Sequence, residues 1–219
     1  MSEVDDVETY CWPEFPALPA CGRPVVLRVA VPKARADARR MLREALRQML
    51  AAWSGLRSEQ LPLEETPRGP VWNGLLRDAT LDIGLSYVRR AGCQPASGQA
   101  GCQPALVQAG WQPAPQMEGW IGLLRGGRIG VDVMEAERFA ELEGVAQSFL
   151  NPEAAADIRG AADPALTFAA AWTEREARLK CLKRGLSEWT AGDAQAEAEC
   201  ACRRLVLGQR LVGAVCWLG

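Results

Sequence analysis

The sequence predicts an α+β fold in which each half of the chain contributes one long helix and antiparallel strands. Residues 34–53 repeat apolar side chains with the period of an amphipathic helix, and residues 164–184 lie between a helix start signal and a helix stop signal. Two other regions place short apolar runs on both sides of a glycine, the pattern of a β-hairpin. With 219 residues, 48% of them hydrophobic, the chain can bury a substantial core.

The first helix is expected from Ala34 to Trp53, with Gly55 as its stop. Its apolar stripe consists of Met41, Leu42, Ala45, Leu46, Met49, Leu50 and Trp53. Four arginines repeat every fourth residue beside that stripe: Arg35, Arg39, Arg43 and Arg47. Such a run is usually a solvated flank, and we expect this role for Arg43 and Arg47.

Residues 91–116 form an internal repeat of nine-residue units built on Ala-Gly-Cys-Gln-Pro-Ala. The proline and glycine of each unit oppose both a helix and a central strand, and the few apolar groups cannot build a core. We therefore expect an inserted loop or linker. A partner-specific flap is the functional alternative.

Two hairpins and a long helix are expected after the repeat. The expected strands are residues 120–124, 128–133, 202–207 and 211–217. Gly126-Gly127 turns the first pair, and Gly208-Gln209 turns the second. Between the hairpins, helical pieces are expected at residues 135–149 and 152–159. The long helix follows, with Asp163 as N-cap, Pro164 as first residue and Gly185 as C-terminal stop.

The eight cysteines are expected to be small buried or half-buried residues. None is paired with another in C-x-x-C spacing, and a chain of this size needs no disulfide to fold. They are Cys11, Cys21, Cys93, Cys102, Cys181, Cys200, Cys202 and Cys216. We accordingly expect neither a disulfide nor a cysteine metal site.

Charge and composition exclude several classes of function. The net charge of -2 argues against general nucleic-acid binding, which needs a basic face. No apolar run is long enough for a membrane span, and the acidic first residues are unlike a secretory signal, so a cytoplasmic protein is expected. The chain has no histidine, which excludes Ser-His catalysis and histidine-ligated zinc.

Two carboxylates and a lysine form a candidate metal- and phosphate-binding site. Asp132 ends the run Gly130-Val131-Asp132 of a predicted strand, while Trp172, Glu176 and Lys180 recur every fourth residue and share one face of the last long helix. Carboxylates are hard ligands that suit Mg²⁺, whose shell is normally completed by water and substrate phosphates. The pattern indicates a phosphorylated substrate. A solvated helix with a Glu–Lys pair is the plain alternative for the helix taken alone.

Three motifs in register resemble those of the surfactin-type 4'-phosphopantetheinyl transferases. Residues 130–133 resemble that family's Gly-Ile-Asp-Ile/Val, and residues 148–153 resemble its Phe-Phe-Ser/Thr-x-x-Glu turn. Residues 172–180 resemble its Trp-x-x-Lys-Glu-Ala-x-x-Lys helix, with Arg175 in place of the first lysine. The resemblance implies two similar α+β halves about a pseudo-twofold axis, which we place at residues 1–115, including the repeat, and 116–219.

The resemblance also implies an activity. The enzyme would transfer 4'-phosphopantetheine from coenzyme A to a serine of an acyl-carrier or peptidyl-carrier protein, with Mg²⁺, releasing 3',5'-ADP. Asp132 and Glu176 would bind the metal, and Glu176 would also help to remove the serine proton. Lys180 and Arg184 would contact the phosphates. A monomer is expected.

The remaining implied coenzyme A contacts lie in the N-terminal half. Arg39 matches the arginine that binds the 3'-phosphate, and Arg68 lies in a shifted form of the family's Gly-Lys-Pro turn. Ser86 and Tyr87 match its Ser-His segment, with tyrosine in place of histidine.

Met134 stands where the family has a second acidic metal ligand, and a thioether binds Mg²⁺ poorly. Either water or the next residue, Glu135, would compensate, although Glu135 points to the opposite face if the strand continues. Met134 and Tyr87 together favour an alternative function: a non-catalytic homologue that binds coenzyme A or a carrier protein.

Overall fold

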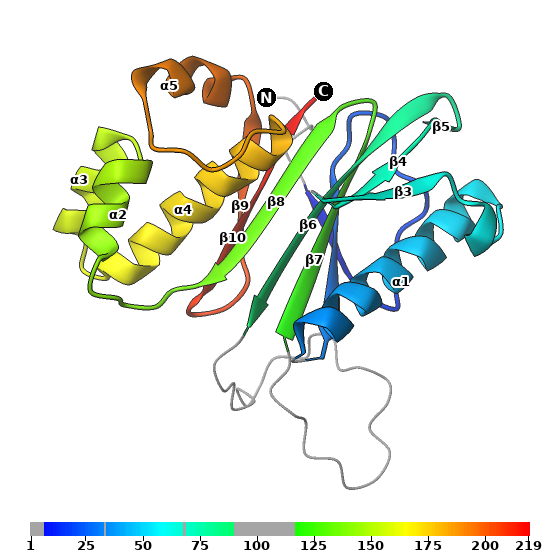
Figure 1. Cartoon of the computed structure of the whole chain (residues 1–219), viewed down its shortest axis with the longest axis horizontal. Coiled ribbons are helices and arrows are strands. Elements are labelled where there is room, and N and C mark those ends of the chain that lie inside the picture. The colour runs from blue at the N-terminus through cyan, green and yellow to red at the C-terminus, as the bar shows by residue number, and fades with distance from the viewer. Residues whose placement is uncertain (1–6, 33, 68, 90–116) are drawn as a thin grey trace, which may run out of the picture.

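The computed structural model describes residues 7–32, 34–67, 69–89 and 117–219 (Figure 1). The predicted repeat and Arg68 lie outside these residues. The strands are β1 (Glu8–Cys11), β2 (Val25–Val31), β3 (Leu63–Thr66), β4 (Gly69–Trp72), β5 (Leu75–Leu76), β6 (Ala79–Arg89), β7 (Met117–Arg125), β8 (Arg128–Glu135), β9 (Ala201–Val206) and β10 (Leu211–Leu218). The helices are α1 (Arg35–Ser54), α2 (Leu142–Phe149), α3 (Pro152–Gly160), α4 (Pro164–Cys181), α5 (Ala191–Ala198) and a 3₁₀ turn (Ser58–Gln60). The predicted α+β class is confirmed.

Two sheets face each other, and each carries a long helix on its outer face (Figure 1). The first sheet has the order β1-β2-β7-β6-β5, and the second has the order β8-β10-β9. Strands β3 and β4 form a separate hairpin. Helix α1 covers the first sheet and α4 covers the second, so the layers run α1, sheet, sheet, α4.

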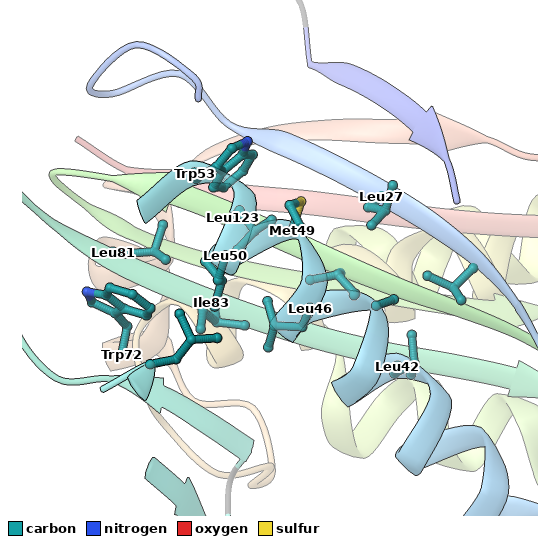
Figure 2. Close-up of a cluster of buried hydrophobic side chains, with 14 of the residues drawn as sticks. Leu27, Leu42, Leu46, Met49, Leu50, Trp53, Trp72, Leu81, Ile83 and Leu123 are labelled. Atoms are coloured by element: carbon teal, nitrogen blue, oxygen red, sulfur yellow. The ribbon is translucent and has the colours of Figure 1, made fainter. Parts of the chain in front are cut away.

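Helix α1 buries an apolar stripe against the first sheet (Figure 2). Leu42, Leu46 and Leu50 are buried and point to strand residues such as Leu27 and Leu123. The helix ends where predicted, because Gly55 adopts a left-handed φ of 72° and donates its N–H to Ala51. The expected stripe is confirmed except at its first member: Met41 faces solvent and is 40% exposed.

The turn at Gly126-Gly127 does not form the predicted hairpin. Strand β7 pairs with β2 and β6, whereas β8 pairs with β10, so the turn carries the chain from the first sheet to the second. The boundary expected at residues 115–116 therefore precedes a strand of the first sheet. The C-terminal hairpin is confirmed, since β9 and β10 pair antiparallel.

Strand β8 approaches the first sheet closely because glycines leave room for it. A Cβ on Gly84 of β6 would lie 3.2 Å from the backbone nitrogen of Val131, and one on Gly122 of β7 would lie 3.2 Å from Ile129. Ile129 and Val133, which lie two residues before and two residues after Val131 on the same face of β8, are buried in the apolar core between the sheets. The two sheets are thus locked together along β8.

Helix α4 starts as predicted and ends three residues early. Asp163 accepts a hydrogen bond from the N–H of Leu166, and Pro164 is the first helical residue. At the other end, Lys183 rather than Gly185 takes a left-handed φ, of 58°. The N–H of Arg184 bonds to the carbonyl of Leu179, which satisfies one of the last helical carbonyls. The backbone therefore turns away before Arg184.

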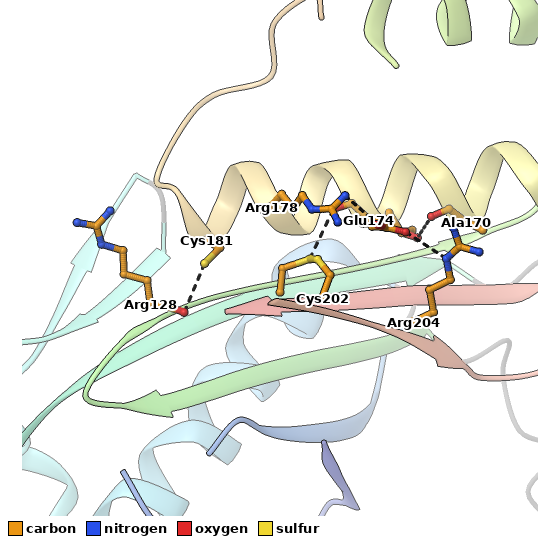
Figure 3. The surroundings of a disulfide bond; sticks show 9 residues. Arg128, Ala170, Glu174, Arg178, Cys181, Cys202 and Arg204 are labelled. Atoms are coloured by element: carbon orange, nitrogen blue, oxygen red, sulfur yellow. Dashed lines mark hydrogen bonds and ion pairs between the residues drawn. A yellow bond between two sulfur atoms is a disulfide. The ribbon is translucent and has the colours of Figure 1, made fainter. Parts of the chain in front are cut away.

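The expectation of unpaired cysteines is wrong for Cys202 and Cys216, which form a disulfide between β9 and β10 (Figure 3). The two residues are direct partners in the strand register, with Cα atoms 4.1 Å apart. Nearby, Cys181 and Cys200 are buried free thiols. Burial, and next the neighbouring Cys200, raise the pKa of Cys181 to about 12, which favours the protonated thiol.

No helix in the described part of the chain combines the length and the apolar character needed to cross a membrane.

Candidate active site

The site is built where β8 meets the backbone of α4. Residues of β8 alternate between the core and the helix, and Gly130 and Asp132 face α4. A Cβ on Gly130 would lie 2.0 Å from the carbonyl oxygen of Ala177 and 2.5 Å from the nitrogen of Cys181. Only glycine therefore allows this contact. The close approach brings the Asp132 carboxylate to the side chains of α4.

Asp132 is held by two donors on a single oxygen. Its Oδ1 accepts a hydrogen bond of 3.1 Å from the Ser86 hydroxyl and one of 2.6 Å from the ammonium of Lys180. Lys180 also donates to the carbonyl of Val131, at 3.1 Å. Among the described residues, Oδ2 of Asp132 accepts no hydrogen bond. The carboxylate thus keeps one oxygen available.

Glu176 lies one helical turn before Lys180 on the same face of α4. Burial, together with the nearby negative charge of Asp132, raises the pKa of Glu176, while Lys180 and Arg175 oppose this rise. Glu176 forms no hydrogen bond or ion pair with any other described residue. Two carboxylates are therefore close together with unused oxygens.

These two carboxylates fit a divalent cation such as Mg²⁺, since they provide hard oxygen ligands and a local excess of negative charge. No group of three or more acidic, histidine or cysteine side chains that could hold a metal occurs among the described residues. A cation at Asp132 and Glu176 would have to complete its shell with water and substrate oxygens. Mg²⁺ normally does so.

Met134 follows Asp132 on the same face of β8 but packs elsewhere. Its side chain contacts an apolar cluster that includes Phe168, Trp172 and residues of α2 and α3. Trp172 stacks on Phe168 with ring centres 5.4 Å apart, as expected for a core anchor. Strand β8 continues through Glu135, which places that side chain on the opposite face from Asp132. Glu135 is thus poorly placed to replace the missing ligand.

A second polar cluster lies on the other side of β6. Tyr87 accepts hydrogen bonds at its hydroxyl from Arg35, at 2.6 Å, and from Arg39, at 3.4 Å. Both guanidinium groups also lie over its ring. Burial opposes ionisation of the phenol, but the two arginine hydrogen bonds and charges outweigh it and lower the pKa of Tyr87. The guanidinium groups of Arg35 and Arg39 thus lie close together in the N-terminal part of α1.

Two other predicted site residues have partners within the protein. Arg184 forms an ion pair of 2.6 Å with Asp193 of α5. Ser86 is buried, donates a hydrogen bond to Asp132 and accepts one from the N–H of Val133. No role was predicted from the sequence for Arg35, which the structure brings to Tyr87 beside Arg39. Its only signal was its spacing of four from Arg39.

The opposite face of α4 anchors α5. Arg175 is buried, donates to the carbonyl of Ser187 at 3.0 Å and lies 3.9 Å from both Asp193 and Glu197. Burial is the main cause that raises the pKa of Glu197, and Arg175 opposes it. The arginine that replaces the family's lysine therefore has a structural place in this chain.

Comparison with known families identifies part of this region. Residues 128–203 match the family model described as the 4'-phosphopantetheinyl transferase superfamily. The matched segment runs from β8 through α4 into β9 and contains Asp132, Glu176 and Lys180. A search of curated proteins found no match to the chain. The superfamily match supports a transferase of phosphopantetheine in general terms.

Proposed function

We propose that the protein transfers the 4'-phosphopantetheine group of coenzyme A to a serine hydroxyl of an acyl-carrier or peptidyl-carrier protein. One observation carries the proposal: Asp132 of β8 meets Glu176 and Lys180 of α4 inside the segment that matches the superfamily model. Under this proposal the two helix-covered sheets are the two similar halves implied by the resemblance.

Asp132 and Glu176 would hold Mg²⁺, which when bound would neutralise charge on the pyrophosphate of coenzyme A. Glu176 would accept the proton of the carrier serine, directly or through a water. A carboxylate within hydrogen-bond reach of the serine can act as a general base. The serine oxygen would then bond to the β-phosphorus, and the bond to the bridging oxygen would break and release 3',5'-ADP.

Lys180 would stabilise the charge that develops on the phosphate oxygens. Its ammonium lies 2.6 Å from Asp132 and is partly exposed, so a phosphate near the carboxylates would come within its reach. Fixed cations of this kind stabilise a transition state without reorganisation.

The Arg35–Tyr87–Arg39 cluster would bind the 3'-phosphate of coenzyme A. Two guanidinium groups at one phenol provide several N–H donors, and phosphate is a preferred partner of arginine. The N-cap of α1 is Ala34, which has no side-chain acceptor, so the first amides of the helix also remain available to an anion.

The second candidate function, the runner-up, is that of a homologue that binds coenzyme A or a carrier protein without catalysis. Met134 favours it, because this side chain belongs to an apolar cluster and provides no acidic ligand. The proposal is tested by incubating an apo-carrier protein with coenzyme A, Mg²⁺ and the purified chain, and measuring the intact mass of the carrier. Transfer predicts a mass increase of one phosphopantetheinyl group that requires Mg²⁺. An unchanged mass across a panel of fatty-acid, polyketide and peptide carriers would support the runner-up.

A further inference from the structure

Two backbone N–H groups on the outer edge of β8 donate hydrogen bonds to side chains instead of to a neighbouring strand. β8 is the edge strand of its sheet, and an edge strand has unpaired backbone N–H groups. The N–H of Ile129 donates to Asp82 of β6 at 2.7 Å, and the N–H of Val133 donates to the hydroxyl of Ser86 at 3.2 Å. Two residues of one strand, four apart, thus form two matching contacts to the other sheet.

Asp82 and Ser86 differ in the second partner that each side chain has. Asp82 also forms an exposed ion pair with Lys183, just after the end of α4. Ser86 also donates its hydroxyl to Oδ1 of Asp132. Because the Ser86 oxygen accepts the N–H of Val133, its own hydrogen is free to point at the carboxylate. Ser86 is buried, with 6% of its surface exposed, so this hydroxyl has little freedom to turn elsewhere.

Ser86 fixes which oxygen of Asp132 is used. The hydroxyl and Lys180 both donate to Oδ1, which sets the rotation of the carboxylate and leaves Oδ2 without a donor among the described residues. Lys180 alone would hold it loosely, because its long stem is flexible and its side chain is 34% exposed. A short buried hydroxyl provides the rigid part of the arrangement.

We propose that Ser86 is a positioning residue for Asp132, acting through the carboxylate on the divalent cation, and that it makes no contact with coenzyme A. The inference rests on the proposed function, because it assumes that Asp132 binds the metal. Groups that orient a metal ligand typically contribute about 10–100-fold to metal affinity.

The test measures binding of Mn²⁺ alone to the full-length protein by electron paramagnetic resonance, without any transfer assay. Ser86→Ala should weaken Mn²⁺ binding by about tenfold or more. Asp82→Ala is the matched control, since it removes the companion contact to β8 and leaves Asp132 untouched. Its Mn²⁺ affinity should stay within about twofold of the unmodified protein, although both variants leave one β8 amide unpaired.

Two results would overturn the inference alone: unchanged Mn²⁺ affinity in Ser86→Ala, or equal weakening in Asp82→Ala, which would show that strand docking is responsible. If Ser86→Ala does not fold, Ser86→Thr and Ser86→Val are compared instead. Threonine and valine have nearly the same shape, but only threonine has a hydroxyl. Only the threonine variant should then bind Mn²⁺ with the higher affinity. Absence of saturable binding by the unmodified protein, or unchanged binding by Asp132→Ala, would overturn the proposed metal site together with this inference.

Discussion

Helices α1 and α4 occupy equivalent outer layers but bury different side chains. α1 buries only apolar residues, which fill the core over the first sheet. α4 buries Thr173 and Arg175 and turns Glu176 and Lys180 toward β8, and it lies so close to that strand that Gly130 is required. Helix α1 therefore contributes mainly stability, whereas α4 gives up apolar contact to hold charged groups in fixed places.

The largest effect is expected where α4 touches β8. Gly130→Ala should lose both stability and transfer, because its Cβ would overlap the backbone of α4. We expect a cost at or above the upper end of the ~1–3 kcal/mol typical of overpacking, measured by chemical unfolding. Gly144→Ala in α2 is the control, since a Cβ there meets nothing within 4 Å, and it should stabilise by ~0.5–1 kcal/mol. Normal stability of Gly130→Ala would contradict the close packing.

Truncating the core of α1 should separate stability from chemistry. Leu46 is fully buried, and Leu46→Ala should destabilise the protein by ~2–5 kcal/mol. The protein that remains folded at low temperature should transfer at nearly the normal rate. Met41→Ala, on the exposed side of the same helix, should change the free energy of unfolding by less than ~0.5 kcal/mol. A specific loss of rate in folded Leu46→Ala would show that α1 also shapes the carboxylate site.

The start of α1 should affect substrate binding only. Arg39→Ala should raise the KM for coenzyme A by about tenfold, the effect of losing one hydrogen bond to a charged group. Dephospho-coenzyme A, which lacks the 3'-phosphate, should show a smaller change. Arg43→Ala, one turn further on and paired with Glu65 at 2.7 Å, should leave both KM values unchanged. Equal effects of Arg39→Ala on the two substrates would remove the 3'-phosphate assignment.

The smallest effect concerns the charge of Glu176. Since burial raises its pKa in the folded protein, the charged form is destabilising near neutral pH. Glu176→Gln should therefore be slightly more stable than the unmodified protein at pH 7 without metal. This advantage should shrink as the pH falls through the raised pKa and disappear below the ordinary glutamate value of 4.5, where Glu176 is neutral in both the folded and the unfolded protein. A stability difference that stays constant over this pH range would contradict the raised pKa.

The sequence predicted what local patterns determine. The helix period located α1, the Asp163-Pro164 signal located the start of α4, and four-residue spacing placed Glu176 and Lys180 on one face. Long-range pairing was not accessible in this way. Gly126-Gly127 signals a turn, but it carries no information on which strands pair. Two N–H groups on the unpaired edge of β8 donate instead to the side chains of Asp82 and Ser86.

For two of the predicted site residues the structure shows partners that local sequence patterns did not reveal. Arg184 was assigned to the phosphates by the family resemblance; in the structure α4 ends at Cys181 and Arg184 forms an ion pair with Asp193. Ser86 was assigned to coenzyme A by the family resemblance, and its bond to Asp132 spans 46 residues of sequence, which no local pattern reveals. The disulfide of Cys202 and Cys216 likewise follows from strand register, which cysteine spacing does not reveal.

We propose that Asp132 and Glu176 act together on one divalent cation. The most direct test is a double-mutant cycle of the single-turnover transfer rate at saturating coenzyme A and Mg²⁺, with Asp132→Asn, Glu176→Gln and the combined variant. If both carboxylates bind the same cation, each single change should remove more than about 10²-fold of the rate, and the double variant should be little slower than the worse single one. Rate losses that simply multiply in the double variant would show that the two carboxylates act independently and would contradict the shared site.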